Sequence, residues 1–155
     1  MHFDDFSTED ICIREASIDD MYMCSLLVPE FSEPYEKPVY IERLSNKKHL
    51  CLLAESGGVM LGFKVGYALD NELFYSWMGG VTPEARGKGI AVRLLLAQTA
   101  WCQHAGFQRI QVKTRNKFVG MLRLLLKYNY QLIDFQKYEP LEESRVLLEA
   151  DVTVG

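Results

Sequence analysis

The chain has 155 residues, 48% of them hydrophobic and 25% charged, which is typical of one globular domain spanning residues 1–155. A formal net charge of -4 argues against general nucleic-acid binding, because neutralising phosphates requires an excess of Lys and Arg. The four cysteines and three histidines are scattered without metal-ligand spacing, so we expect reduced thiols and no metal. Neither a signal segment nor a run of roughly 20 apolar residues is present, which favours a soluble cytoplasmic protein with no membrane partner.

The N-terminal part of the chain predicts one strand, two helices and an antiparallel meander. We expect a short strand at 11–14, a helix over 21–27 that Ser17 caps, and a second helix at 39–44 after a proline-rich segment. From His49 onward the pattern changes to strands separated by short turns. The expected strands of this meander are 50–54, 59–69 and 73–81.

The C-terminal half alternates helices and strands. A helix begins near Gly87–Gly89 and ends at Gly106, because its apolar residues recur at helical spacing at Ile90, Leu94, Ala97 and Trp101. A strand at 107–113 precedes a second helix, which Thr114 or Asn116 caps, and two strands at 131–138 and 145–152 complete the chain. This order predicts an α/β or α+β fold. The sheet would be mixed, mostly antiparallel, with about seven strands and about four flanking helices.

Residues 79–91 form the segment most informative about function. A strand ends there, the chain turns, and a helix begins with Gly87 and Gly89 beside its first turn. The first turn of a helix presents unpaired N–H groups and the positive end of the dipole, and glycines allow a phosphate to approach the backbone. Arg86 and Lys88 add positive charge. The pattern therefore predicts a phosphate or pyrophosphate site.

Several ligands would suit such a turn. The spacing differs from a Walker A loop, since Gly-Ile-Ala follows Lys88, and it lacks the third glycine of a dinucleotide-binding loop. A glycine-relaxed turn with no ligand and a nucleotide-phosphate-binding domain of another kind remain as alternatives.

The segment resembles a known family. Arg86-x-x-Gly89-x-Ala91, preceded by Val81-x-Pro83, is similar to the (Q/R)xxGx(G/A) signature of the GNAT superfamily of acyl-CoA N-acyltransferases. The resemblance extends over about residues 11–152 in the order of the elements. Residues 74–81 and 116–122 also resemble a bacterial branch of this family.

The resemblance implies a sheet that splays between two central parallel strands, 73–81 and 107–113, with a β-bulge at the paired glycines. Acetyl-CoA would be the co-substrate, with its pantetheine arm along the first strand, its thioester carbonyl on the N–H of Gly79 and its pyrophosphate on the helix N-terminus. The implied cofactor-binding residues are Gly79, Gly80, Val81, Arg86, Gly87, Lys88, Gly89, Ile90, Ala91 and Asn116.

The catalytic groups depart from the family pattern. Many members place on the last long helix a Tyr that protonates the departing thiolate, and here that position is Leu125. Tyr128 is the nearest phenol. On the strand before the signature, alternation would place Tyr75, Trp77 and Gly79 on one face toward the cleft, with Tyr75 orienting the amine or a water.

The resemblance places the acceptor beside the proline-rich segment. Glu30 and Phe31 would line that site together with Tyr75 and Trp77, and Glu30 or Glu33 is a candidate base unless none is needed. The predicted function is acetyl transfer from acetyl-CoA to a primary amine of a small molecule or peptide, directly in a ternary complex. Because Leu125 cannot donate a proton, a catalytically silent acyl-CoA-binding module is the alternative. A homodimer is common in the family.

Overall fold

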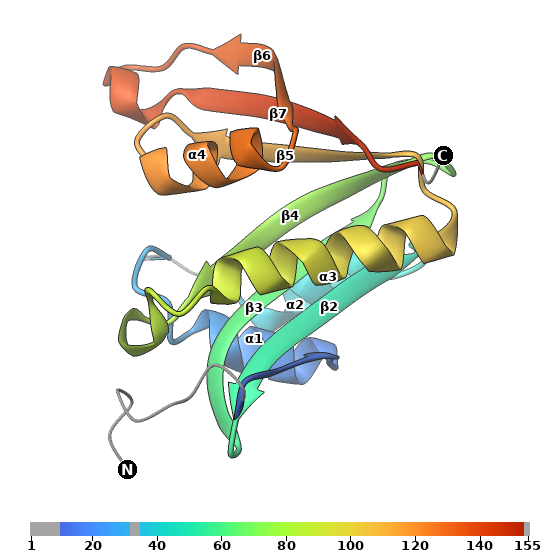
Figure 1. Cartoon of the computed structure of the whole chain (residues 1–155), viewed down its shortest axis with the longest axis vertical. Coiled ribbons are helices and arrows are strands. Elements are labelled where there is room, and N and C mark those ends of the chain that lie inside the picture. The colour runs from blue at the N-terminus through green and yellow to red at the C-terminus, as the bar shows by residue number, and fades with distance from the viewer. Residues whose placement is uncertain (1–9, 32–34, 154–155) are drawn as a thin grey trace. The chain divides into compact units, whose positions relative to one another are not determined.

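The computed structural model describes residues 10–31 and 35–153, which form four α-helices and a seven-stranded mixed sheet (Figure 1). The predicted fold class is confirmed. No helix in these two ranges is long and apolar enough to span a membrane. The elements are β1 (Cys12–Glu15), α1 (Ile18–Ser25), α2 (Lys37–Leu44), β2 (His49–Ser56), β3 (Val59–Ala68), β4 (Leu73–Val81), α3 (Ile90–Ala105), β5 (Arg109–Arg115), α4 (Val119–Lys127), β6 (Gln131–Gln136) and β7 (Arg145–Asp151), with 3-10 turns η3 (Pro83–Ala85) and η4 (Leu141–Glu143).

The strand order is β1-β2-β3-β4-β5-β7-β6. β1 with β2, β2 with β3, β5 with β7 and β6 with β7 are antiparallel pairs. β4 and β5 are parallel, in register from Leu73 opposite Arg109 to Ser76 opposite Val112. The expected parallel pair is thus confirmed, whereas the expected splay farther along these strands stays a prediction.

The described residues form two compact units, and the boundary between the units divides β4 and α3. The first comprises residues 10–67 and 78–100, apart from 32–34, and the second comprises 68–77 and 101–153. Each unit has its own buried residues. The whole of the predicted phosphate-binding segment, residues 79–91, lies in the first unit.

Helices cover both faces of the strands in the first unit. Gly62 and Phe63 are neighbours on β3, so they point to opposite faces. A Cβ on Gly62 would lie 3.2 Å from Ile90 of α3, whereas the Phe63 ring lies 5.9 Å from the Phe31 ring, just after α1. The α3 helix therefore packs on one face, and α1 with the segment after it packs on the other. Figure 1 shows the same separation.

An aromatic cluster lies in the second unit. The Phe74 ring of β4 is 5.4 Å from the Trp101 ring and 5.3 Å from the Phe107 ring. Phe74, Leu125 on α4 and Leu148 on β7 are completely buried. Burial of such large side chains stabilises each by roughly 1.5–3 kcal/mol relative to exposure.

Local signals account for several helix ends. Ser17 is the N-cap of α1, and its hydroxyl accepts a hydrogen bond from the Asp20 N–H at 3.1 Å, as predicted. Gly106 ends α3 with a φ of 93°, a left-handed conformation that favours glycine. The predicted caps of α4 are wrong. β5 runs through Thr114, the N–H of Asn116 bonds to the Ser144 carbonyl, and Phe118 is the N-cap.

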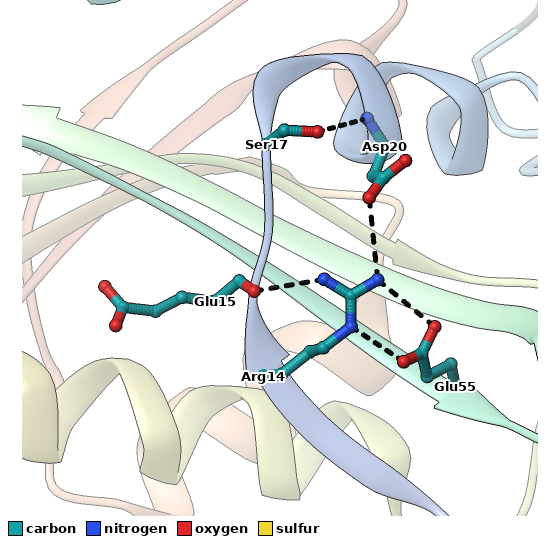
Figure 2. Close-up of polar contacts among 5 residues, drawn as sticks. All are labelled: Arg14, Glu15, Ser17, Asp20 and Glu55. Atoms are coloured by element: carbon teal, nitrogen blue, oxygen red, sulfur yellow. Dashed lines mark hydrogen bonds and ion pairs between the residues drawn. The ribbon is translucent and has the colours of Figure 1, made fainter.

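An ion cluster joins β1, β2 and α1 (Figure 2). The Arg14 guanidinium donates to both carboxylate oxygens of Glu55, at 2.7 and 3.3 Å, and lies 3.5 Å from Asp20. Hydrogen bonding from Arg14 holds the pKa of Glu55 below its ordinary value, although burial opposes this shift. The Glu15 carboxylate points away from the cluster in Figure 2.

This geometry predicts a pH-dependent contribution of Glu55 to stability. A carboxyl with a lowered folded-state pKa stabilises the fold above its unfolded-state pKa, and the contribution is lost as pH falls through the folded value. Glu55→Gln should therefore lower the urea midpoint at about pH 7, and the difference from the native chain should shrink by about pH 3. Glu15→Gln, with the same charge change on β1, is the control. An equal effect of both variants at neutral pH would contradict the assignment.

Candidate functional site

The strand-to-helix turn of the first unit is built on two glycines in the left-handed region. β4 ends at Val81, the η3 turn follows, and Gly87 and Gly89 have φ values of 79° and 75°. Side chains other than glycine adopt such angles only with strain. The first intrahelical bond of α3 runs from the Arg93 N–H to the Gly89 carbonyl at 3.1 Å. The sequence signature is therefore the turn that begins α3.

This turn can accept an anion. Helix geometry leaves the N–H groups of the first turn of α3 without intrahelical acceptors. A Cβ on Gly87 or Gly89 would meet no described atom within 4 Å, so space is open above the backbone. Lys88 lies half-buried between the two glycines. The positive end of the helix dipole and open backbone donors together favour a phosphate group.

Arg86 already has an anionic partner. Its Nη2 donates to Oε1 of Glu30, and its Nε lies 3.4 Å from the Val81 carbonyl oxygen. Both side chains are partly exposed, at 47% for Arg86 and 37% for Glu30. A predicted cofactor residue and a predicted acceptor-site residue are therefore joined. A phosphate that binds Arg86 must share the guanidinium with this carboxylate or displace it.

Gly79 and Gly80 allow close packing of β4 against its neighbours. A Cβ on Gly80 would lie 2.8 Å from Val28 Cγ1 and 3.5 Å from the Phe31 ring. A Cβ on Gly79 would lie 3.2 Å from the Phe63 carbonyl oxygen. Real Cβ atoms do not approach other atoms as closely as 2.8 Å, so the approach at Gly80 requires a residue without a side chain.

The two ends of β4 make different side-chain contacts. In the second unit, Phe74 packs against Trp101 of α3. In the first unit, the Met78 sulfur accepts a hydrogen bond at 3.6 Å from Tyr40 of α2, whose ring packs against Tyr22 of α1. The shared face of Tyr75, Trp77 and Gly79 and the β-bulge at the paired glycines both stay predictions.

Lys64 is a buried cation that the sequence analysis missed. It lies on β3 with 8% of its surface exposed, and a Cβ on Gly79 would lie 3.4 Å from its Cγ. Burial lowers the pKa of Lys64 to about 8. A signal was present in the sequence, because Lys64 is the only charged residue in the strand 59–68.

Gln98 is a second polar residue on a buried surface. The apolar spacing of α3 predicted Ala97 on the packed face, yet Ala97 is half-buried and Gln98 is 1% exposed. The Gln98 Nε2 has no hydrogen-bond partner among the described residues. Hydrophobic periodicity does not find such a residue, since its polarity indicates a surface position.

The remaining candidates belong to the second unit or lie outside the described residues. Tyr75 and Trp77 are half-buried on β4, and each has contacts of its own. Asn116 follows β5, and Tyr128 is the half-buried C-cap of α4. Glu33 lies outside the described residues. Within residues 10–31 and 35–153, no three His, Cys, Asp or Glu side chains gather as a metal site.

Comparison with known families decides the classification. The sequence model of the acetyltransferase (GNAT) family matches residues 17–130, which include β4, the glycine turn and α3. This chain belongs to the GNAT acetyltransferase family. Comparison with curated proteins found no match.

Solved structures share the GNAT fold at low sequence identity. The ribosomal-protein-S18-alanine N-acetyltransferase of Escherichia coli aligns with a TM-score of 0.81 at 11% identity, over 94% of this chain and 96% of that chain. Ard1 of Thermoplasma volcanium gives 0.79 at 16% identity, over 94% and 99%. A GNAT acetyltransferase of Elizabethkingia anophelis, solved with acetyl-CoA bound, gives 0.72 at 19% identity, over 92% and 99%. These similarities establish the fold.

The structure buries the residue at which this GNAT protein departs from the family pattern. Leu125 is completely buried on α4, so it lies in the core of the second unit. Tyr130 is also buried, and its hydroxyl has no hydrogen-bond partner among the described residues. Burial raises the pKa of the Tyr130 phenol, which makes it a weaker acid.

The packing at Gly80 predicts a large effect of one methyl group. Gly80→Ala should lower the free energy of unfolding by about 1–3 kcal/mol, because the Cβ overlaps the buried Val28 side chain. Gly120→Ala on α4 is the control, since no described atom lies within 4 Å of its Cβ position. It should stabilise the chain by about 0.5 kcal/mol. Urea unfolding measures both, and equal stability of the two variants would refute this close packing.

Proposed function

We propose that this GNAT protein transfers an acetyl group from acetyl-CoA to a primary amine, directly within a ternary complex. The observation that carries this proposal is the open glycine turn at the N-terminus of α3, directly after a strand that ends in Gly79, Gly80 and Val81. The relative from Elizabethkingia anophelis, which was solved with acetyl-CoA, supports this choice of co-substrate.

Backbone donors would hold the co-substrate. The N–H groups from Gly87 to Ala91 are proposed to bind the pyrophosphate, with Arg86 and Lys88 adding charge. The pantetheine arm would follow Gly79 to Val81 as an added strand, and Asn116 stays a candidate contact from the sequence. Most of these proposed contacts are made by the backbone. The side chains of Val81, Ile90 and Ala91 would therefore act only by holding that backbone in place. Ile90 is 2% exposed and anchors the first turn of α3.

The proposed reaction is a nucleophilic acyl substitution. The amine nitrogen attacks the thioester carbon, and the N–H of Gly79 stabilises the negative charge that develops on oxygen. The C–S bond then breaks, and its electron pair goes to sulfur. The amine loses one proton and the thiolate gains one, so the products are an amide and the CoA thiol.

The proposed acceptor is a small amine or the amino group of a peptide. Glu30 and Phe31, both in the first unit, are proposed to contact it, and Tyr75 and Trp77 stay candidates from the sequence. Phe31 packs near Gly80 in the first unit, which supports this assignment. Four unpaired cysteines, three of them buried, support action in the reducing cytoplasm.

A catalytically silent acyl-CoA-binding module is the second candidate. The buried Leu125 favours it, because this residue cannot donate a proton to a thiolate. Calorimetry with acetyl-CoA and a thiol-release assay across amines, amino acids, polyamines and peptides distinguish the two candidates. Release of thiol with any acceptor supports the enzyme, and micromolar binding without release supports the module. Absence of binding at millimolar CoA would refute both.

The glycine turn predicts a selective loss of CoA affinity. Gly89→Glu adds negative charge at the proposed pyrophosphate site and should weaken CoA binding at least 100-fold. Gly106→Glu is the matched control, since its φ of 93° and open surroundings impose a similar backbone cost at the other end of α3. Calorimetry on the folded variants measures the difference. Equal affinity of the two variants for CoA would move the phosphate site elsewhere.

Tyr128 is expected to be dispensable for proton transfer. Tyr128 lies three residues beyond Leu125, which rotates its side chain by about 300° and advances it by about 4.5 Å along the helix. Tyr128→Phe should therefore keep most of kcat, and Tyr75→Phe is the comparison on β4. Steady-state kinetics would contradict this expectation if Tyr128→Phe lost the 10²–10⁴-fold typical of a missing general acid.

A further inference from the structure

Lys64 faces the layer between β3 and α3. Gly62, two residues earlier, approaches Ile90 and Leu94 of α3, and residues two apart on a strand share a face. The Lys64 side chain therefore enters the same layer. Its neighbour across the β2–β3 pair is Leu52, which is apolar and buried.

The stem of Lys64 lies against Gly79. A Cβ on Gly79 would lie 3.4 Å from Lys64 Cγ and 3.7 Å from its Cα. The glycine thus leaves room for this aliphatic chain, and the ammonium lies within one side-chain length of the Gly79 backbone. Gly79 is also the residue whose N–H we assign to the thioester carbonyl.

Gln98 is a second buried polar side chain in this unit. It lies on α3, one helical turn beyond Leu94, which approaches Gly62 of β3. It is 1% exposed, and its Nε2 has no hydrogen-bond partner among the described residues.

Lys64 has no counter-ion among the described residues. No described ion pair or hydrogen bond involves it, and its neighbours on the adjacent strands are Leu52 of β2 and Gly79 of β4, neither of which carries a charge. A buried cation without an anion is costly, which is why burial lowers the pKa of Lys64 to about 8. An anion formed beside Gly79 would offset that cost.

We propose that Lys64 is the proton donor to the departing CoA thiolate, a role that rests on the proposed function. When the C–S bond breaks, the electron pair moves to sulfur and the Lys64 ammonium transfers a proton to it, forming the thiol. The neutral amine of Lys64 then regains a proton through solvent from the acylated nitrogen.

The acidity of Lys64 suits this step. Burial brings the pKa of Lys64 to about 8, in the same range as the pKa of about 8.5 of a free thiol, so the ammonium can exchange a proton with a thiolate and is reprotonated at neutral pH. Lys64 also supplies a donor in a chain that has Leu125 at the usual position. A thiolate formed beside Gly79 would be the counter-ion that the buried Lys64 ammonium lacks.

The bound product provides a test that needs no acceptor. The thiolate absorbance of bound CoA is titrated against pH, with the S-methyl-CoA complex as reference for the protein cysteines. In the native chain the pKa of the bound thiol should lie at least about one unit below that in Lys64→Met. Lys137→Met, the same charge change on an exposed residue, should match the native chain.

Kinetics with any accepted amine provides the second measurement. Lys64→Met should lower kcat by about 10²-fold or more and change the Kd for CoA by less than about threefold. Its melting temperature should not fall, because removal of a buried unpaired charge relieves a desolvation cost. An unchanged thiol pKa, or an unchanged kcat where turnover is measured, overturns the role of Lys64 and leaves the proposed function intact. Failure of the native chain to bind CoA overturns the proposed function itself.

Discussion

The close approach of other backbone and side chains to the end of β4 is the constraint on which the site depends. Gly80 lies so near Val28 that a methyl group would overlap it, and Gly79 accommodates the stem of Lys64. Larger residues would push away the layers on either side. Packing on both faces therefore fixes the strand that leads into the glycine turn. The same absence of side chains would let a ligand approach the backbone, so packing and the proposed binding share one cause.

Two cations of the first unit, Arg86 and Lys64, differ in burial and in charge pairing. Arg86 is paired with Glu30 at a partly exposed position, where the energetic value of an ion pair is small. A phosphate bound to several backbone donors would compete well for the guanidinium. Lys64 presents the opposite situation, because it is buried and no described carboxylate faces it. Arg86 suits a permanent anion such as pyrophosphate, and Lys64 suits an anion that exists only during reaction.

Sequence patterns predicted most elements because their causes are local. Ser17 caps α1 through a bond to a residue three positions away, and Gly106 ends α3 through its own φ. The same reasoning failed for α4, where the N–H of Asn116 bonds to Ser144, a partner distant in sequence. It also missed Lys64 and Gln98, because their burial depends on the layers packed against β3 and α3 and not on local hydrophobic spacing.

The sequence by itself determined the order of the elements, the family and the turn that begins α3, since glycine spacing and periodicity are properties of adjacent residues. Only the tertiary structure decided which side chains meet. It paired Glu30 with Arg86, buried Leu125 and set Lys64 against Gly79. These contacts join residues far apart in the chain, and no spacing rule encodes them. Burial likewise changed the acidity of Lys64, because the loss of hydration depends on the layers that surround an ammonium and not on its neighbours in sequence.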